Sequence, residues 1–132
     1  MSRSTSFCVG VSERVGRHAD AVRIPARAVQ VVTAAIPGLT PTGGVPFAFE
    51  AEARQAWANV RKALLAAGAS LSDIVTVRTW LTSAGDVCEY LEVFDRLVEH
   101  DPVTSLVVVD RLLDPQMRVQ IEVTAVLPTS DG

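Results

Sequence analysis

Apolar residues recur at helical spacing between residues 49 and 67, and this pattern predicts an amphipathic helix. Gly68 follows directly and is expected to stop the helix, because glycine accepts the left-handed conformation that helix ends often require. The side of this helix away from the apolar stripe is polar, and it carries Glu52, Gln55, Asn59 and Lys62.

A second apolar stripe predicts another helix, which begins at Asp86. Asp86 is a favourable N-cap residue, and Glu89 three positions later completes the pattern of a capping box. The helix must end near His100, because Asp101 and Pro102 cannot continue it. The stripe consists of Val87, Leu91, Phe94 and Leu97 or Val98.

Segments that are rich in β-branched residues, or that alternate apolar and polar residues, predict strands. A hairpin is expected from residues 6–13 and 21–24, and composition makes residues 38–46 a loop. The order of elements, β-β-β-α-β-α-β-β, predicts an α+β fold in which two helices pack on one face of a single mixed sheet. The other expected strands cover residues 28–35, 74–81, 103–109 and 119–126.

The strand expected at residues 103–109 is apolar in both of its alternating sets of side chains. Such a strand is typical of a sheet that is buried on both faces. Because two helices cover only one face, the cover for the other face is expected to come from another subunit. The pattern therefore predicts an oligomer.

Length and composition are those of one globular domain, which is expected to span residues 1–132. The net charge of −3 gives no overall attraction to a phosphate backbone, so no nucleic-acid partner is predicted. No apolar run approaches the roughly 20 residues that span a bilayer, and the N-terminus lacks the pattern of a signal peptide. No membrane partner is therefore predicted, and the cytoplasm is the expected location.

The chain has two cysteines and two histidines, which limits its redox and metal chemistry. Cys8 and Cys88 lie far apart and lack a CxxC pattern, so both are expected to be buried thiols without a disulfide or zinc. The alternative for Cys88 is a reactive thiol at the start of a helix. Phosphate-binding loops, nucleophile elbows and zinc-protease motifs are absent, and no metal or other cofactor is expected.

Three motifs, AVQVVTAAIP at residues 28–37, GASLSDIV at residues 68–75 and IEV at residues 121–123, follow one another in an order that resembles the RidA (YjgF/YER057c/UK114) family. Residues 28–37, AVQVVTAAIP, are similar to the family's LVFVSGQIP strand, and residues 68–75, GASLSDIV, match its turn before the next strand. Residues 121–123, IEV, match the closing apolar-Glu-apolar triplet. The resemblance implies a chorismate-mutase-like fold of the bacillar type, a homotrimer with inward-facing sheets, and a ligand pocket at each subunit interface.

The chain departs from the family signature at its key charged position. The best-known family members hydrolyse 2-imino acids to 2-keto acids, and an arginine grips the substrate carboxylate; here Thr104 stands in its place. One neutral hydroxyl does not replace a bidentate guanidinium, and losing one partner of a buried ion pair costs about 3–5 kcal/mol. Standard 2-iminopropionate hydrolysis is therefore not predicted. Asp110, where the signature takes a small or basic residue, is a second departure.

Two residues are candidates for catalysis. Glu122 matches the signature glutamate, and the resemblance implies that this residue positions the hydrolytic water. The alternative is that Glu122 is a solvated or ion-paired carboxylate on the polar side of its strand. His18 falls near the family's pocket tyrosine and is a candidate for proton transfer near neutral pH, with a surface loop histidine as the alternative.

The expected donor segment of the pocket is altered as well. Thr33 keeps the hydroxyl of the family's SGQ segment, whereas Ala34 replaces its glycine, and the added methyl group is expected to reshape the pocket. Residues around the altered signature position are expected to line the same pocket, namely Thr104, Ser105 and Leu106.

Another arginine is a candidate to supply the missing positive charge. Arg17 and Arg78 are favoured, and for each the alternative is a solvated or ion-paired arginine. Arg78 lies mid-strand in an expected sheet and needs a partner there, for which Asp110 and Glu122 are available. Trp80 is expected to be a core or interface aromatic, and its alternative role is to line the ligand pocket.

The sequence therefore predicts a divergent RidA-like trimer that acts on a small metabolite without a cofactor. Its activity would be that of a pathway-specific deaminase, a hydrolase of imines or enamines, or that of a proton-transfer or cyclisation enzyme. The alternative is a trimer that binds a metabolite or a partner protein and performs no chemistry. Both functions share one fold, so the fold does not separate them.

Overall fold

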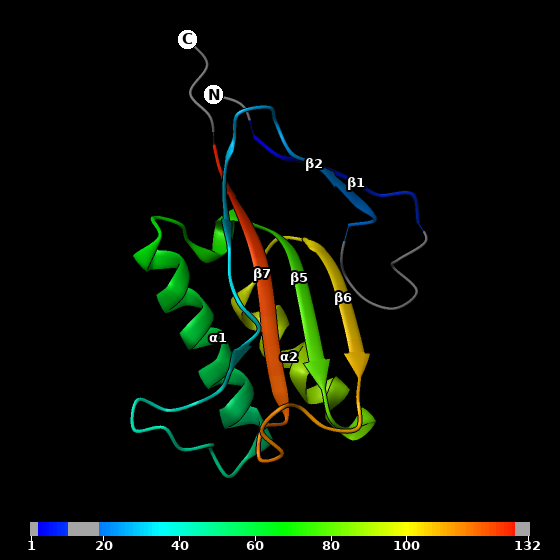
Figure 1. The fold of residues 1–132 in the computed structure, drawn as a ribbon. Helices are drawn as coiled ribbons and strands as arrows, with labels where there is room; N and C mark the ends of the chain where they lie inside the picture. The colour runs from blue at the N-terminus through cyan, green and yellow to red at the C-terminus, as the bar shows by residue number, and fades with distance from the viewer. Residues whose placement is uncertain (1–2, 11–18, 129–132) are drawn as a thin grey trace.

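The computed structural model describes residues 3–10 and 19–128, and its core is a mixed sheet with two helices on one face (Figure 1). Two short 3-10 helices, η2 (Leu71–Asp73) and η3 (Ala84–Asp86), precede β5 and α2. The helices are α1 (Phe49–Ala66) and α2 (Val87–Leu97). The strands are β1 (Thr5–Phe7), β2 (Ala21–Arg23), β3 (Val29–Val32), β4 (Ile36–Pro37), β5 (Ile74–Leu81), β6 (Val103–Val108) and β7 (Val119–Leu127).

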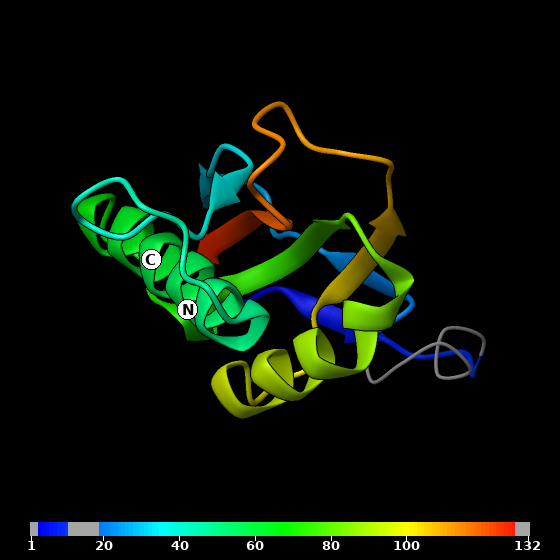
Figure 2. The ribbon, with the colours of Figure 1, turned by 90° about the horizontal axis from the view of Figure 1, so that it is seen from below.

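The main sheet has the order β3-β7-β5-β6, and β4 also pairs with β7. Only β5 and β6 are parallel; the other pairs are antiparallel. Figure 2 shows both helices on the same side of this sheet, and the core forms between them and the sheet. The expected α+β architecture is confirmed. No helix within the described residues combines the length and the apolar character that a membrane crossing requires.

The stop signal after α1 is confirmed. Gly68 has a φ of 85°, and its amide donates to the carbonyl of Leu65, while the amide of Ala69 donates to the carbonyl of Leu64. This is the Schellman arrangement, in which a left-handed residue satisfies carbonyls at the helix end. The chain then turns through η2, where the Asp73 carboxylate accepts from the Ser70 amide at 2.9 Å, and enters β5.

Asp86 is the N-cap residue of α2, as expected, but the prediction that its side chain caps the helix is wrong. Asp86 makes no side-chain cap hydrogen bond, because η3 precedes the helix and places Asp86 in a helical conformation with φ −93° and ψ −4°. Ser83 acts one turn earlier instead, and its hydroxyl accepts from the Gly85 amide at 3.2 Å. The helix ends at Leu97, since Val98 is already extended.

The strand expected at residues 28–35 is interrupted, and β3 and β4 pair with β7 on either side of the break. Thr33 closes the break: its amide donates to the carbonyl of Val123 at 3.0 Å, and its hydroxyl accepts from the Val123 amide at 3.1 Å. The expected hairpin is present as β1 and β2, but β1 is shorter and lies earlier than residues 6–13.

A residue on the polar side of α1, Glu52, forms a buried ion pair with Arg118. Glu52 is fully buried, and its carboxylate accepts from the Arg118 amide at 2.7 Å and from the Arg118 Nε at 2.6 Å. Arg118 also donates to the carbonyls of Pro46 and Phe47. The pair therefore ties α1 to the loop before it and to the start of β7.

The two thiols were expected to be buried, and this is wrong. Both Cys8 and Cys88 are exposed. Cys88 follows the first residue of α2 on the side away from Tyr90, Val93 and Phe94, which are the buried residues of that helix. Its exposure follows from the helical period, because position 88 falls outside the apolar stripe.

Tyr90 is the single tyrosine of the chain and is 2% exposed, with its hydroxyl 2.6 Å from the Thr79 hydroxyl. Burial raises the pKa of Tyr90 above its ordinary value of about 10, and the hydrogen bond to Thr79 offsets part of that rise. Because the pKa of Tyr90 is higher in the folded state than in the unfolded state, this group leaves the free energy of unfolding unchanged below about pH 10. The free energy of unfolding then falls as the pH rises further.

We expect this linkage to appear as alkaline destabilisation that begins near pH 10. Tyrosinate absorbance of the native protein is expected to stay absent there and to rise only together with unfolding. The stability difference between wild type and Tyr90→Phe is expected to shrink with rising pH. A reversible tyrosinate titration near pH 10 in the folded protein would show that Tyr90 is solvated.

Candidate functional site

Strand register places the candidate polar residues in one row across the sheet. On the sheet face opposite the helices, Arg78 of β5 pairs with Glu122 of β7 and, on its other side, with Ser105 of β6. The neighbouring pair Val77 and Val123 points into the core, so alternation turns Arg78 and Glu122 away from the helices. We call this side of the sheet the open face.

The break between β3 and β4 lies at the end of the same row. Thr33 bonds to Val123, and Ile36 pairs with Ile121, so residues 34–35 together oppose the single residue Glu122. Two residues against one is a β-bulge, a feature that often re-aims side chains beside active sites. Ser105, Arg78, Glu122 and the bulge at residues 34–35 form what we call the charged row.

Arg78 and Glu122 bring opposite charges together on the open face. Directly paired residues of antiparallel strands have Cβ atoms about 5 Å apart. Arg78 is exposed and Glu122 is half-buried. In the part of the chain that the structure describes, the Glu122 carboxylate makes no side-chain hydrogen bond or ion pair, so it remains available to a ligand or another subunit.

The surroundings of the charged row mix apolar and amide groups. Trp80 pairs with Gln120 on β7 and with Val107 on β6, so these three residues form the next row of the open face. The sequence analysis did not identify Gln120 as a site residue. It could have done so, because Gln120 is two residues before Glu122 and therefore lies on the same face of β7. Val107 is 45% exposed, and Val32 near the bulge is 66% exposed.

Thr104 and Leu106 belong to the other face of β6. Thr104 pairs with Val77 of the core, and Leu106 packs against the core. A single chain therefore places Ser105 beside Arg78 and Glu122 but keeps Thr104 and Leu106 on the opposite side of the sheet. Asp110 lies beyond the end of β6 and is exposed.

These motifs and this topology match one protein family. The family model described as endoribonuclease L-PSP matches residues 14–127. The chain belongs to the endoribonuclease L-PSP (YjgF/RidA/UK114) family. The name of the model does not assign an activity to this member, because function resides in the site and not in the fold.

Solved structures of this family resemble the chain over most of its length. Rv2704 of Mycobacterium tuberculosis, a YjgF/YER057c/UK114 member, is 31% identical with a TM-score of 0.67, and the match covers 94% of this chain and 99% of Rv2704. TdcF of E. coli, solved with bound serine, is 28% identical with a TM-score of 0.69, covering 84% and 94%. YyfB of Yersinia pestis is 22% identical with a TM-score of 0.80, covering 96% and 100%, and shows the shared fold.

Two candidate residues of this family member, Arg17 and His18, lie outside the described residues. The chain returns at Ala19, which is 2% exposed and whose amide donates to the carbonyl of Pro102 at 3.2 Å. Asp20 accepts from the Val9 amide at 2.7 Å, which fixes the base of the hairpin. This hydrogen bond holds Ala19 next to Pro102, which precedes β6 and lies two residues before Thr104.

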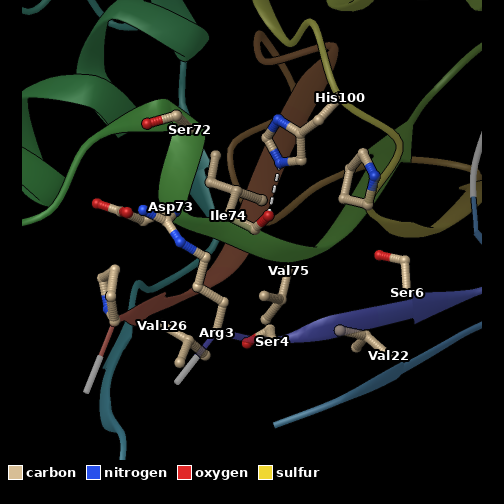
Figure 3. Close-up of a pocket in the computed structure, with 12 residues that line it drawn as sticks. Arg3, Ser4, Ser6, Val22, Ser72, Asp73, Ile74, Val75, His100 and Val126 are labelled. Carbon is tan, nitrogen blue, oxygen red and sulfur yellow. Dashed lines mark hydrogen bonds between the residues drawn. The ribbon is translucent and has the colours of Figure 1, made fainter. Parts of the chain in front are cut away.

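The β1–β2 hairpin borders a small, partly open cavity of about 140 Å³ at one end of the sheet (Figure 3). His100 closes one side, with its Nε2 2.7 Å from the carbonyl oxygen of Ile74, and Val126 forms part of the floor. Ile74 is four residues before Arg78 on β5, a separation of about 13 Å along a strand. This cavity is thus distinct from the charged row.

No group of three or more His, Cys, Asp or Glu side chains gathers in the described part of the chain. The charged row instead offers one guanidinium, one carboxylate and the Ser105 hydroxyl. Such a set binds small polar molecules through charge-assisted hydrogen bonds.

Proposed function

We propose that this chain forms a homotrimer, with the open face between subunits, and binds a small metabolite in the clefts of that interface. The exposed valines of the open face, Val32 and Val107, support burial against another subunit. The placement of Thr104 supports it as well, because Thr104 and Glu122 lie on opposite sides of one sheet. A pocket that contains both signature positions would take them from two subunits.

The charged row indicates the class of ligand. A guanidinium and a carboxylate on directly paired residues match a molecule that carries both charges, such as an amino acid or an imino acid. We assign Arg78 to the ligand carboxylate, in place of the missing signature arginine, and Glu122 to the ligand nitrogen. The direct pairing of Arg78 with Glu122 carries this assignment. The serine bound to TdcF is a ligand of the same class.

Glu122 also suits the chemistry of a deaminase that works without a cofactor. A carboxylate beside a C=N group can take a proton from the water that adds to the carbon, and return it to the nitrogen, which leaves as ammonia. The same group would serve a pathway-specific proton-transfer or cyclisation enzyme. Thr104 favours the second candidate, a trimer that binds its metabolite without turnover, because the family's carboxylate anchor is absent at that position.

Thermal shift with the common amino acids, serine first, tests the ligand assignment. We expect a ligand that stabilises wild type to lose its effect in Arg78→Ala and in Glu122→Gln, because removing one side of a buried charge pair costs about 2 kcal/mol or more, roughly 30-fold in Kd. Arg111→Ala, in the exposed loop between β6 and β7, is the matched control and is expected to keep the shift. Light scattering is expected to give three chain masses.

The proposal fails if no amino acid shifts the wild type, if Arg78→Ala keeps the shift, or if the protein is a monomer. Freshly generated 2-iminopropionate separates turnover from binding. It is expected to release keto acid no faster than in buffer, because Arg78 stands on a different strand and face from position 104. Rapid release that survives Arg78→Ala would show that position 104 needs no arginine and that Arg78 is not the anchor.

A further inference from the structure

The two helices leave a groove of about 560 Å³ between them on the side of the molecule away from the open face. Figure 2 shows α1 and α2 together on this side of the sheet. We call it the helix groove. It is lined by Arg54, Trp57, Ala58, Arg61, Lys62 and Leu65 of α1, by Leu71, and by Val93, Arg96 and Leu97 of α2.

The floor of the helix groove is apolar and is continuous with the core. Trp57 is 1% exposed and Val93 is 3% exposed, so both present only their outer edges. Leu65 and Leu97 stand on the two sides and are 56% and 40% exposed. Large aliphatic side chains left open beside an apolar floor are typical of a surface that binds a partner.

The rim of the helix groove is positively charged, although the chain as a whole carries −3. Arg54, Arg61 and Lys62 stand on α1, and Arg96 stands on α2. Glu50 contacts this rim; its carboxylate lies 2.7 Å from Arg54 and 4.0 Å from Arg96. An acidic partner would therefore complement the groove.

The shape of the rim selects the kind of acidic partner. The lining of α1 runs from Arg54 to Leu65 along one stripe, about 16 Å or three helical turns. Cations occur along this length and on both sides, whereas an amphiphile with a single anionic head would need them at one end. An amphipathic helix with acidic residues beside its apolar stripe matches both the length and the charge.

We propose that the helix groove binds an acidic amphipathic helix of a partner protein. Leucine side chains of that helix would pack on Trp57, Leu65 and Leu97, and its carboxylates would lie along Arg61, Lys62 and Arg96. The groove is on the side of the sheet opposite the open face, so the interaction is independent of the trimer and of the charged row.

Fluorescence anisotropy with a labelled peptide tests this interaction. The peptide carries leucine at positions i, i+3, i+4 and i+7 and glutamate at the flanking positions, and it is expected to bind saturably. The double variant Arg61→Glu and Lys62→Glu is expected to weaken binding at least about tenfold. Leu97→Ser is likewise expected to weaken binding, because Leu97 lines the groove. Arg111→Glu is the control for the double variant and Leu113→Ser is the control for Leu97→Ser; both lie at exposed positions outside the groove and are expected to change binding less than about twofold.

Four outcomes would overturn the proposal. The first is the absence of saturable binding, and the second is equal binding of a scrambled peptide that spreads its leucines around the helix. The third is an equal loss in Arg111→Glu and in the Arg61, Lys62 double variant, which would mean attraction to charge alone. Dodecanoate that competes fully with the peptide at the same concentration would assign the groove to an amphiphile and also refute a helix partner.

Discussion

Replacing Glu52 by alanine is expected to lower the free energy of unfolding by about 3 kcal/mol, and the melting temperature by roughly 10 °C. The Glu52 side chain is fully buried and holds the amide and the Nε of Arg118 at 2.7 and 2.6 Å. Removing one partner of such a pair leaves the other charge without compensation. We take the lower end of the usual cost because the Arg118 side chain is 32% exposed.

Glu50→Ala is the matched control for this prediction. Glu50 lies two residues earlier on the same helix and pairs with Arg54 at 2.7 Å, but both side chains are about half exposed. Exposed pairs contribute about 0–1 kcal/mol, so this variant is expected to unfold near the wild-type midpoint. Urea titrations at equal protein concentration compare the two. Equal destabilisation by both substitutions would refute the distinction between the buried and the exposed carboxylate.

Gly38→Ala is expected to lower the free energy of unfolding by about 1–3 kcal/mol through overpacking. A Cβ atom at position 38 would lie far inside van der Waals contact distance of the Glu52 carbonyl oxygen and 2.9 Å from the Glu52 Cγ. The obstacle is helix backbone, which is anchored by the pair with Arg118, so it moves less easily than a side-chain tip.

Gly44→Ala in the same loop separates this clash from the general effect of replacing glycine. The nearest atom to a Cβ at position 44 is the Thr40 Oγ1 at 3.6 Å, an ordinary contact. This variant is expected to be neutral or slightly stabilising, because alanine restricts the unfolded chain. A Gly38→Ala protein as stable as Gly44→Ala would mean that α1 and the loop separate readily, contrary to the packing around Glu52.

Local patterns predicted the parts of the fold that depend on neighbours in the chain. The apolar stripe of residues 49–67 and the stop at Gly68 correspond to α1 and its Schellman end. Helical period and glycine conformation act over three to five residues, so the sequence carries them directly. The same reasoning erred at Asp86, because a 3-10 turn before the helix changed the backbone angles that capping requires.

Burial of polar residues depended on partners far along the chain. Glu52 was expected on the polar side of its helix, and it is buried because Arg118, 66 residues later, comes back to meet it. Similarly, Asn59 donates to the carbonyls of Pro37 and Leu39 and holds the loop against α1. Helical period assigns a side chain to a direction, but the neighbours in that direction come from tertiary packing.

The candidate site divides in the same way. The sequence by itself determined the family, the alternation that turns Glu122 to one face of its strand, and the loss of arginine at position 104. Only the tertiary structure decided that Arg78 and Ser105 lie in line with Glu122, that residues 34–35 bulge beside it, and that Thr104 lies on the other face. The physical reason is strand register: alternation is a local property of a chain, whereas the residue that stands opposite is set by the packing of distant strands.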